Sequence, residues 1–338
     1  HSPKYSLIIM TPTQSPICLI YAGGTFGSHG TPLSALPAEI FLPILSNLYG
    51  TTDHHIKILN NQIIKDSSLM TPSDFVGFYE LILTAYHDGY RKFVLITGTD
   101  TLSFLAAFLA HAFDEFTDLS LVITGSMQPL LLPQCADLSI NYDSDAWNNL
   151  SQSLDLAAAQ CGTFVHFHHQ SFNAKHTQKI NSQAPNAFMG ADAIFNKSSP
   201  PSINTAIYLN QLPSLIKRAK SVKIRSVYAL PNDPNALADE LLVAADACAV
   251  ILIGYGAGNL PKSQAIIDAL AKLTDRGVAI ICTTMCAYGG TNTDYAAGAW
   301  QYEHGVWASG SLTIPSIYGQ ILWLSITQKL TAWHWKFS

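Results

Sequence analysis

The chain has 338 residues, of which 48% are hydrophobic and 12% are charged. This composition excludes an intrinsically disordered protein, which requires low hydrophobicity and a high net charge. The net charge is −5 and the 18 basic residues form no run, so the sequence lacks the basic stripe of a nucleic-acid-binding protein. The length predicts two domains of ordinary size. The low content of charge also predicts an apolar face that another subunit covers.

No apolar stretch of the sequence reaches the roughly 20 residues that a membrane-spanning helix needs. Before Gly24 the chain has short apolar runs interrupted by proline and polar residues, unlike the continuous apolar segment of a secretory signal peptide. The six cysteines are scattered among apolar or small residues, which favours buried free thiols over a disulfide framework. We therefore expect a cytoplasmic protein with no membrane partner.

Short apolar runs alternate with longer helical stretches along the chain. Continuous runs of four to six apolar residues are typical of strands buried on both faces of a parallel sheet. Strand–helix alternation predicts an α/β fold with a doubly wound, mostly parallel sheet. The expected strands, in chain order, lie in PICLIYAGG, KFVLITGTD, LSLVITGS, GTFVHFHH, AVILIGYGAG and GVAIICTT.

Helices are expected between these strands. Residues 71–89 form one, with Thr71 and Asp74 as its start signals and Gly89 as its stop. Residues 102–116 form a second, and residues 262–277 form a third that ends at Gly277. The alternation breaks at about residues 200–235, which are polar and rich in proline. We therefore predict a larger N-terminal α/β domain over 1–205, a linker over 206–235 and a smaller C-terminal α/β domain over 236–338.

Polar clusters follow two of the expected strands, where open α/β sheets bind ligands. The first cluster, Gly23 to Thr25, is by itself better explained as an ordinary turn, although two glycines also permit a close backbone approach. The second cluster runs from Thr97 to Thr101. A helix N-cap needs only one such residue, so it leaves other hydroxyls and the Asp100 carboxylate unexplained. A threonine hydroxyl becomes a nucleophile when a base removes its proton.

Two further features have a structural and a functional interpretation. Asp66, Ser67 and Ser68 either bind a polar ligand group or form a capping turn before the helix at 71–89. Lys179 is a surface lysine on spacing alone, but a lysine held among hydroxyls and a carboxylate can serve as a base.

Other conspicuous residues point to no metal or cofactor. Alternation along the HFHH strand would place His166 and His168 on one face, yet no third metal ligand has suitable spacing, which favours core or interface histidines. Cys282 and Cys286 are compatible with a metal or redox pair, and buried thiols are the better interpretation. The glycine-rich GYGAGN lacks the spacing of a dinucleotide site.

Several motifs, in this order, resemble the bacterial L-asparaginase family, in particular its cytoplasmic type I branch. The resemblance covers about residues 16 to 310 and implies an amidohydrolase that converts L-asparagine to L-aspartate and ammonia without a metal or cofactor. It also implies a homo-oligomer, a dimer or tetramer, in which a neighbouring subunit completes each site. The motifs are IYAGGTFG, DSSLMTP, LITGTDTLSF, LVITGSMQP, SDAWNNL and GYGAGNLP.

The resemblance also implies roles for individual residues. In that family one threonine lies in a GGT turn and another in a GTDT loop, and both belong to triads that share a tyrosine, an aspartate and a lysine. The catalytic residues implied here are Thr25, Thr99, Asp100 and Lys179, with Lys179 preferred to Lys175 because it ends a Thr-x-Lys segment. The implied substrate-binding residues are Gly24, Ser67, Ser68, Gly98 and Asn259, and Asn259 would reach toward the neighbouring subunit's site.

The sequence departs from the family at several positions. The segment after the GGT turn has no tyrosine, so Ser28, His29 or Thr31 substitutes, or another segment donates one. Residues 131–143 look like an insertion beside the site. These departures keep two alternatives open, namely an amidase for glutamine or another amide, and a non-catalytic amino-acid-binding homologue. Further departures are Thr97 in place of histidine, Ala146 in place of glycine, Pro315 in place of an acidic residue, and an altered C-terminal helix.

Overall fold

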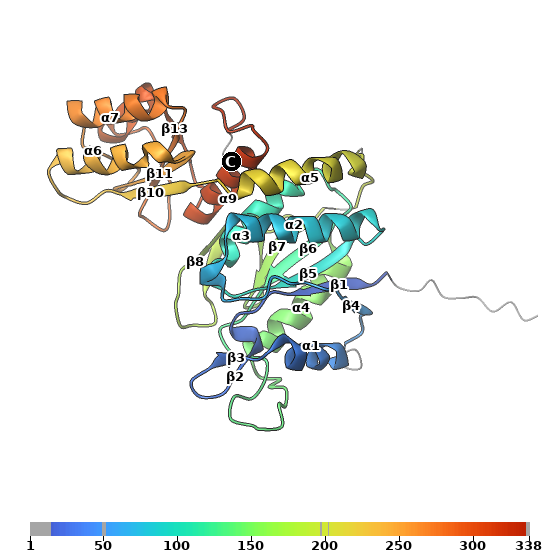
Figure 1. The fold of residues 1–338 in the computed structure, drawn as a ribbon. Coiled ribbons are helices and arrows are strands. Elements are labelled where there is room, and N and C mark those ends of the chain that lie inside the picture. Colours follow the sequence, from blue (N-terminus) through green and yellow to red (C-terminus); the bar gives the residue numbers. More distant parts are fainter. Residues whose placement is uncertain (1–14, 49–51, 197, 202, 336–338) are drawn as a thin grey trace, which may run out of the picture.

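The computed structural model describes residues 15–48, 52–196, 198–201 and 203–335 (Figure 1). These residues form a seven-stranded sheet and a separate four-stranded sheet, together with a two-stranded hairpin. Helices cover both sheets. The structure therefore confirms the predicted two-domain α/β fold with a larger N-terminal and a smaller C-terminal sheet.

The N-terminal sheet has the strand order β4-β1-β5-β6-β7-β8-β9. Its first five strands are parallel, whereas β8 is antiparallel to both β7 and β9. The runs predicted as strands in this region are confirmed. The strands are β1 (Ile17–Tyr21), β4 (Ile56–Ile58), β5 (Lys92–Ile96), β6 (Ser120–Thr124), β7 (Gly162–Phe167), β8 (Gln170–Lys179) and β9 (Phe188–Asp192).

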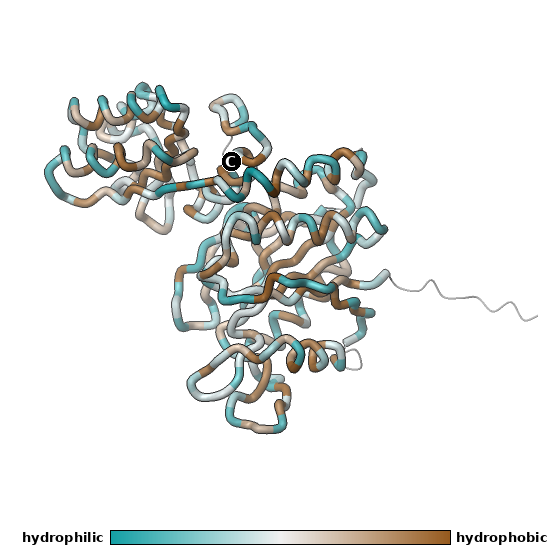
Figure 2. Tube along the Cα trace, viewed as in Figure 1, coloured by the Kyte–Doolittle hydropathy of each residue, from teal (hydrophilic) through white to brown (hydrophobic). Residues whose placement is uncertain are grey.

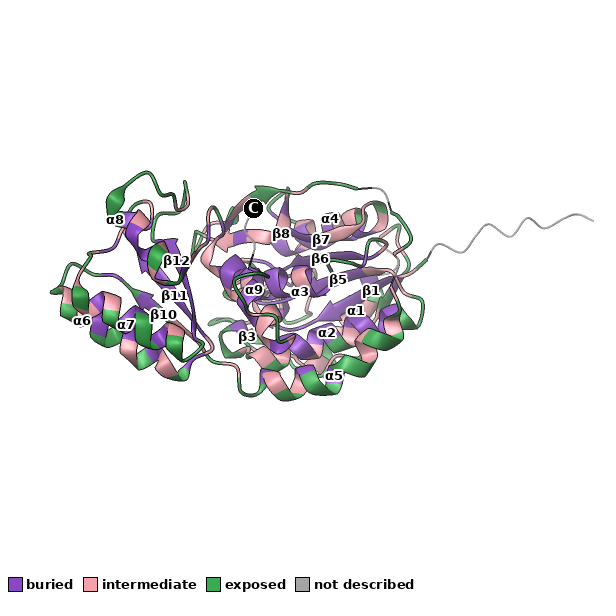
Figure 3. Cartoon of the chain, turned by 90° about the horizontal axis from the view of Figure 1, so that it is seen from above, coloured by how far each residue is buried: buried purple, intermediate pink, exposed green. Residues whose placement is uncertain are grey.

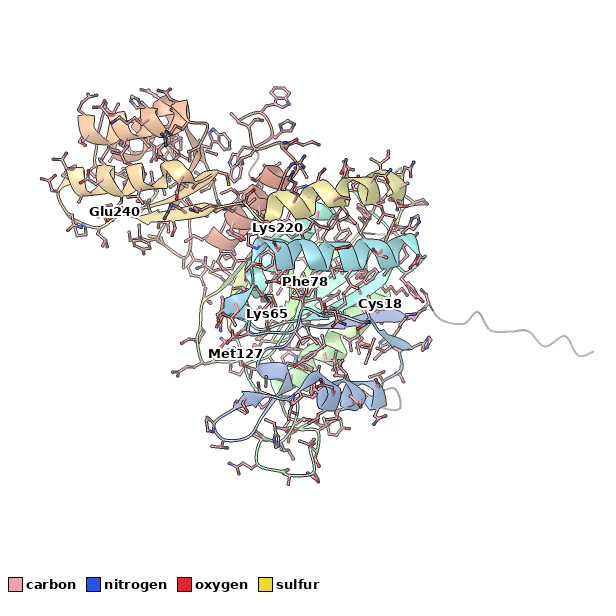
Figure 4. The ribbon with its side chains drawn as sticks, in the orientation of Figure 1. Cys18, Lys65, Phe78, Met127, Lys220 and Glu240 are labelled. Carbon is pink, nitrogen blue, oxygen red and sulfur yellow. The ribbon has the colours of Figure 1, made fainter. Side chains whose placement is uncertain are left out.

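Helices cover both faces of this sheet, which is why its central strands β1, β5 and β6 are mostly apolar and buried. Along β1, Cys18 packs with Phe78 of α2 on one face, and its neighbour Leu19 packs with Phe41 of α1 on the other. Figure 4 labels Cys18 and Phe78, and Figure 3 shows the strands buried between exposed helical surfaces. The helices of this domain are α1 (Ala38–Ser46), α2 (Pro72–His87), α3 (Leu102–Ala112), α4 (Asp145–Ala159) and α5 (Thr205–Ala219).

The helix boundaries follow the predicted signals. Thr71 and Asp74 form a complete capping box at the start of α2, because each side chain accepts a hydrogen bond from the other residue's backbone N–H. Gly89 follows the end of α2 with φ 107°, and Gly277 follows the end of α7 (Gln264–Asp275) with φ 77°. Both values lie in the left-handed region that favours glycine.

The C-terminal sheet is parallel, with the order β10-β11-β12-β13. Helices α6 and α7 pack on one face of it, and α9 packs on the other. Its elements are β10 (Ile224–Tyr228), α6 (Pro234–Val243), β11 (Ala249–Gly254), α7 (Gln264–Asp275), β12 (Ala279–Thr284), α8 (Ala296–Ala299), β13 (Val306–Ala308) and α9 (Ile314–Ile326).

The segment 206–235, which was predicted to be a linker, instead contains regular secondary structure. It contains nearly all of α5 and the whole of β10, which pairs with β11. Helix α5 buries only Leu212, Leu215 and Ala219 and has Pro213 in its interior. The narrow apolar stripe and the proline explain why the sequence here suggested a linker.

Helix α9 joins the two domains. Ile317 and Ile321 pack against the C-terminal sheet, whereas Leu322 and Ile326 belong to the core of the N-terminal domain. On the N-terminal side α9 lies directly on α3. Helix α9 therefore presents apolar residues to both domains. Figure 2 colours the chain by hydropathy and shows hydrophobic stretches in both domains.

None of the helices in the described part of the chain combines the length and apolar character needed to cross a membrane.

Candidate active site

Three turns of the N-terminal domain are packed tightly together beyond β1, β4 and β5. A Cβ atom on Gly24 would lie 2.5 Å from the Cα of Gly98, and a Cβ atom on Gly98 would lie 2.6 Å from Oγ of Ser67. Only glycine permits such a close approach. The turns bearing Thr25, Ser67 and Thr99 are thereby brought to one place. The pair of glycines before Thr25 had suggested such a close approach for the first of these turns.

Lys179, at the end of β8, reaches the second threonine cluster. Its Nζ donates hydrogen bonds to Oγ1 of Thr99 at 2.8 Å and to Oδ1 of Asp100 at 2.9 Å. The lysine side chain is 21% exposed and that of Asp100 is 65% exposed, so the ion pair lies at the border between protein and solvent. Lys175 instead pairs with Asp114, at 2.6 Å.

The hydroxyls around this cluster have distinct partners. Thr101 occupies the N-cap position of α3, but its side chain caps nothing and instead donates to the carbonyl oxygen of Ser67 at 2.8 Å. Ser67 is buried, whereas Ser68 is exposed. The backbone N–H of Ser68 donates to Asp66 at 2.9 Å, and this hydrogen bond lowers the pKa of the Asp66 carboxyl. The Asp66 segment is therefore both a capping turn and a wall of the site.

Thr25 begins a short 3-10 turn, Thr25–Gly27, and is half-buried. Within the described residues, neither its hydroxyl nor its backbone N–H makes a hydrogen bond, and the backbone N–H of Thr99 makes none either. These donors, together with the Thr25 hydroxyl, are therefore available to a bound molecule.

The segment after the Thr25 turn forms a hairpin of β2 (Ser28–His29) and β3 (Ser34–Ala35). The hydroxyl of Ser28 donates to the carbonyl oxygen of Gly24 at 3.3 Å, and Nε2 of His29 bonds to the carbonyl oxygen of Cys135 at 2.9 Å. Thr31 is exposed. Ser28 and His29, two of the three residues considered as substitutes for the missing tyrosine, are thus engaged by backbone carbonyls.

A tyrosine does lie beside this turn, but it comes from β1. A Cβ atom on Gly27 would overlap the hydroxyl of Tyr21, whose ring packs on Phe41 at 4.7 Å between centroids. Burial raises the pKa of Tyr21 to about 12. Tyr21 is thus a buried residue that packs beneath the turn.

Two supporting residues were quoted within a motif but received no role from the sequence. Asp145 accepts hydrogen bonds from the backbone N–H groups of Met127 and Gln128, at 2.7 and 2.9 Å. Asn149 donates to the carbonyl oxygen of Gly125 at 2.9 Å and accepts from the N–H of His168 at 3.0 Å. Figure 4 shows Met127 at the same end of the sheet as Lys65. The sequence signal that could have pointed to Asp145 and Asn149 is a pair of polar residues four positions apart at the start of a helix.

Asn259 lies outside this cluster within one subunit. It follows β11 in the C-terminal domain, and a Cβ atom on Gly298 would lie 2.7 Å from its Oδ1. That oxygen is buried and has no hydrogen-bond partner in the described part of the chain. Its expected role at a neighbouring subunit's site stays a prediction.

The HFHH segment differs from the alternation expected of a continuous strand. β7 ends at Phe167, and His168 and His169 form the turn to β8 with φ 48° and 61°. Two successive positive φ values are typical of a type I′ hairpin. His166 and His168 therefore do not share a strand face, and among the described residues no three His, Cys, Asp or Glu side chains group as a metal site.

The two C-terminal cysteines differ in burial. Cys282 is buried, which raises its pKa to about 12, whereas Cys286 is exposed rather than buried as expected. All six cysteines are free thiols.

The positions that depart from the family motifs have ordinary structural roles. Thr97 and Ala146 are buried. Pro315 lies in the first turn of α9, whose N-cap Thr313 also donates to the carbonyl oxygen of Thr177 at 2.7 Å. A cleft of about 1060 Å³ lies elsewhere, between α3, α5 and α9, and none of the described site residues lines it.

The fold and site together define a two-domain α/β enzyme whose hydroxyl, carboxylate and ammonium groups meet beyond the central strands of the larger sheet. The N-terminal asparaginase family model matches residues 16–197, and the glutaminase/asparaginase C-terminal domain model matches residues 223–330. The chain therefore belongs to the asparaginase family of amidohydrolases, as its motifs indicated.

Individual relatives agree with this assignment. L-asparaginase 1 of Escherichia coli (strain K12) is 26% identical over 333 residues, which cover 94% of this chain and 93% of the relative. The crystal structure of L-asparaginase I from Vibrio cholerae matches with a TM-score of 0.71 at 23% identity, covering 94% of each chain. A probable cytoplasmic L-asparaginase from Campylobacter jejuni matches with a TM-score of 0.67 at 18% identity, covering 94% of this chain and 96% of the other.

Proposed function

We propose that the protein hydrolyses L-asparagine to L-aspartate and ammonia through an acyl-enzyme formed on Thr25. The observation that carries the proposal is the contact of the Lys179 ammonium with Thr99 and Asp100, directly beside the turn that bears Thr25. Amide hydrolysis through an acyl-enzyme requires a nucleophile, a proton acceptor and donors to the oxyanion, and this cluster offers each of them.

In the proposed reaction, Oγ1 of Thr25 attacks the carbon of the substrate's side-chain amide and gives up its proton. Lys179, held in place by Asp100, relays this proton through the Thr99 hydroxyl. The C–N bond then breaks, and the leaving nitrogen takes a proton and departs as ammonia. Water attacks the resulting ester, which releases aspartate and restores the Thr25 hydroxyl.

The free backbone N–H groups of Thr25 and Thr99 supply donors for the oxyanion, in the manner of preorganised dipoles aimed at the developing charge. The α-ammonium and α-carboxylate of the substrate also need partners. We assign the ammonium to Asp100, whose carboxylate is 65% exposed, and the carboxylate to the Ser67 hydroxyl and the neighbouring Ser68. Gly24 and Gly98 allow the substrate to approach the backbone.

Two rival functions have specific motives. A related amidase for glutamine or another amide is favoured by the altered segment after Thr25 and by the glutaminase/asparaginase name of the C-terminal model. A non-catalytic amino-acid-binding homologue is favoured by the missing loop tyrosine. We further propose a cytoplasmic location, supported by the six free cysteines and by the description of the Campylobacter relative.

Ammonia release from asparagine, glutamine and small amides separates these functions. We expect asparagine to be the best substrate, and added hydroxylamine to divert the acyl-enzyme to aspartyl hydroxamate. Faster turnover of glutamine would overturn the asparaginase assignment. Tight aspartate binding without hydrolysis of any amide would establish the binding homologue.

A matched pair of lysines tests the site itself. Lys179→Met removes the ammonium on Thr99 and Asp100, and a lost acid–base group lowers kcat by about 100-fold or more. Lys175 lies on the same strand as Lys179, and Lys175→Met removes its ion pair with Asp114. This variant should keep kcat within about twofold, since a surface ion pair contributes little to stability. A Lys179→Met enzyme that keeps more than about a tenth of kcat/KM, a loss under ~1.4 kcal/mol, would exclude Lys179 from the chemistry.

A further inference from the structure

The segment that follows Thr25 is hydrogen-bonded to a second loop at three points. This loop comprises residues 127–145 and is called the 127–145 loop below. Phe26 accepts from the N–H of Leu130 at 3.0 Å, and the N–H of Gly30 donates to the carbonyl oxygen of Pro133 at 3.2 Å. The third contact joins Nε2 of His29 to the carbonyl oxygen of Cys135 at 2.9 Å. Because a carbonyl oxygen can only accept, His29 is the donor in this contact.

The base of the 127–145 loop is fixed by buried polar groups. Asp145 receives the N–H groups of Met127 and Gln128, and the hydroxyl of Ser144 donates to the carbonyl oxygen of Pro129 at 2.8 Å. Asp145 and Ser144 are both buried. Burial raises the pKa of Asp145 while the N–H donors oppose the increase. These hydrogen bonds tie the first residues of the loop to the start of α4.

The residues just before this loop touch the other threonine. A Cβ atom on Gly125 would lie 2.3 Å from the carbonyl oxygen of Thr97 and 3.5 Å from Cγ2 of Thr99. Asn149 of α4 holds the Gly125 carbonyl at 2.9 Å. One continuous stretch of chain, 125–149, therefore contacts the Thr99 turn on one side and the segment after Thr25 on the other.

We propose that the 127–145 loop sets the position of Thr25 relative to Thr99, and that His29 is the positioning residue through which it acts. His29 is four residues beyond Thr25, and its bond spans 106 positions of sequence, so no local structure supplies this restraint. Misplacing a reacting group by about 1 Å can cost on the order of 100-fold in rate. The inference rests on the proposed function of Thr25 as nucleophile.

The test removes the donor of His29 and then restores it. We expect His29→Ala to lower kcat about tenfold, with KM for asparagine within about twofold, because Ser67 and Asp100 are untouched. His29→Gln keeps an N–H donor on a side chain of similar reach and should recover at least half of kcat. His54→Ala is the matched control, because its Nε2 also joins distant segments, bonding to Asp155 at 2.6 Å, and it should leave kcat unchanged.

Hydrogen exchange, followed by mass spectrometry, provides a second measurement that does not need activity. In His29→Ala, amides of residues 26–36 and 130–141 should exchange faster than in the wild type, and in His54→Ala they should not. If amide exchange in His29→Ala equals that of the wild type, His29 does not restrain the segment. If exchange is faster but kcat is unchanged, His29 restrains the segment without positioning Thr25. A wild type that hydrolyses no amide would refute the proposed function, and the exchange rates alone would then decide whether His29 holds the segment.

Discussion

Lys175 and Lys179 lie on one strand, yet their ammonium groups have entirely different partners. In a regular strand, residues four apart point to the same face. The pairing of β8 with β9 is irregular between Phe172 and Thr177, and irregularities of this kind bend a strand and redirect its side chains. Lys175 accordingly meets Asp114 and Lys179 meets Asp100.

His166 makes stability depend on pH. The residue is 6% exposed, and its ring nitrogens are both hydrogen-bonded, Nε2 to Gln152 at 2.8 Å and Nδ1 to Ser171 at 2.9 Å. Burial, helped by the charge of His169, lowers the pKa of His166 to about 4, whereas an unfolded histidine has a pKa of about 6.5. Between these values the unfolded chain binds more protons, so stability falls as pH falls.

The contribution of His166 should be fully present above about pH 6.5 and lost progressively toward pH 4, with a magnitude on the order of 3 kcal/mol. Urea unfolding of the wild type and of His166→Gln, from pH 7.5 to pH 4, measures it. The difference in unfolding free energy between the two should shrink toward low pH. A constant difference between the wild type and His166→Gln over this pH range would contradict the prediction.

At the scale of elements, α9 depends on one glycine for its packing against α3. A Cβ atom on Gly319 would lie 2.6 Å from Cβ of Ala107 and 2.6 Å from the backbone nitrogen of Phe108. The obstacle is the backbone of another helix, which cannot move aside without disturbing the core. Overpacking of this kind costs about 1–3 kcal/mol.

We therefore expect Gly319→Ala to lower the free energy of unfolding by about 1–3 kcal/mol, even though alanine favours helix by up to ~1 kcal/mol. The control is Gly77→Ala in α2, where the new Cβ would lie 2.5 Å from the flexible tip of Ile63 and the helix gain should offset the shift. Thermal unfolding of both variants decides. Equal melting temperatures for the two would show that α9 can slide on α3.

At the scale of the whole molecule, Asn259 is in the C-terminal domain and the threonines are in the N-terminal one. The resemblance implied that this asparagine serves a neighbouring subunit, and the 12% charge content suits a large apolar interface. The homo-oligomer stays a prediction, and light scattering at assay concentration tests it directly. A fully active monomer would contradict it.

Mixing two inactive variants tests whether Asn259 acts across the subunit boundary. Thr25→Ala and Asn259→Ala should each be impaired alone. When the two are dissociated and reassembled together, half of the dimers are mixed and each has one restored site, so about a quarter of wild-type activity should return. No recovery, despite mixed dimers detected by native mass spectrometry, would confine Asn259 to its own subunit.

The sequence by itself determined the features that depend on neighbouring residues. Continuous apolar runs specified strands buried on both faces, the Thr71–Asp74 capping box and Gly89 specified the bounds of α2, and glycines beside threonines indicated where turns approach closely. Each of these follows from short-range sterics, hydrogen bonding or periodicity. Predictions from such signals were wrong where the signal was weak, as in the amphipathic α5. They were also wrong where a strand gives way to a turn within one apolar and histidine-rich run, as at His168 and His169.

Only the tertiary structure decided which distant groups meet. The bond of Lys179 to Thr99 spans 80 positions of sequence and that of His29 to Cys135 spans 106. Helix α9 joins two cores because both of its faces find a partner. The sequence around each of these residues is compatible with several tertiary arrangements. The packing of sheets, loops and helices selects one of them, because it bends β8 and places the 127–145 loop against the segment after Thr25.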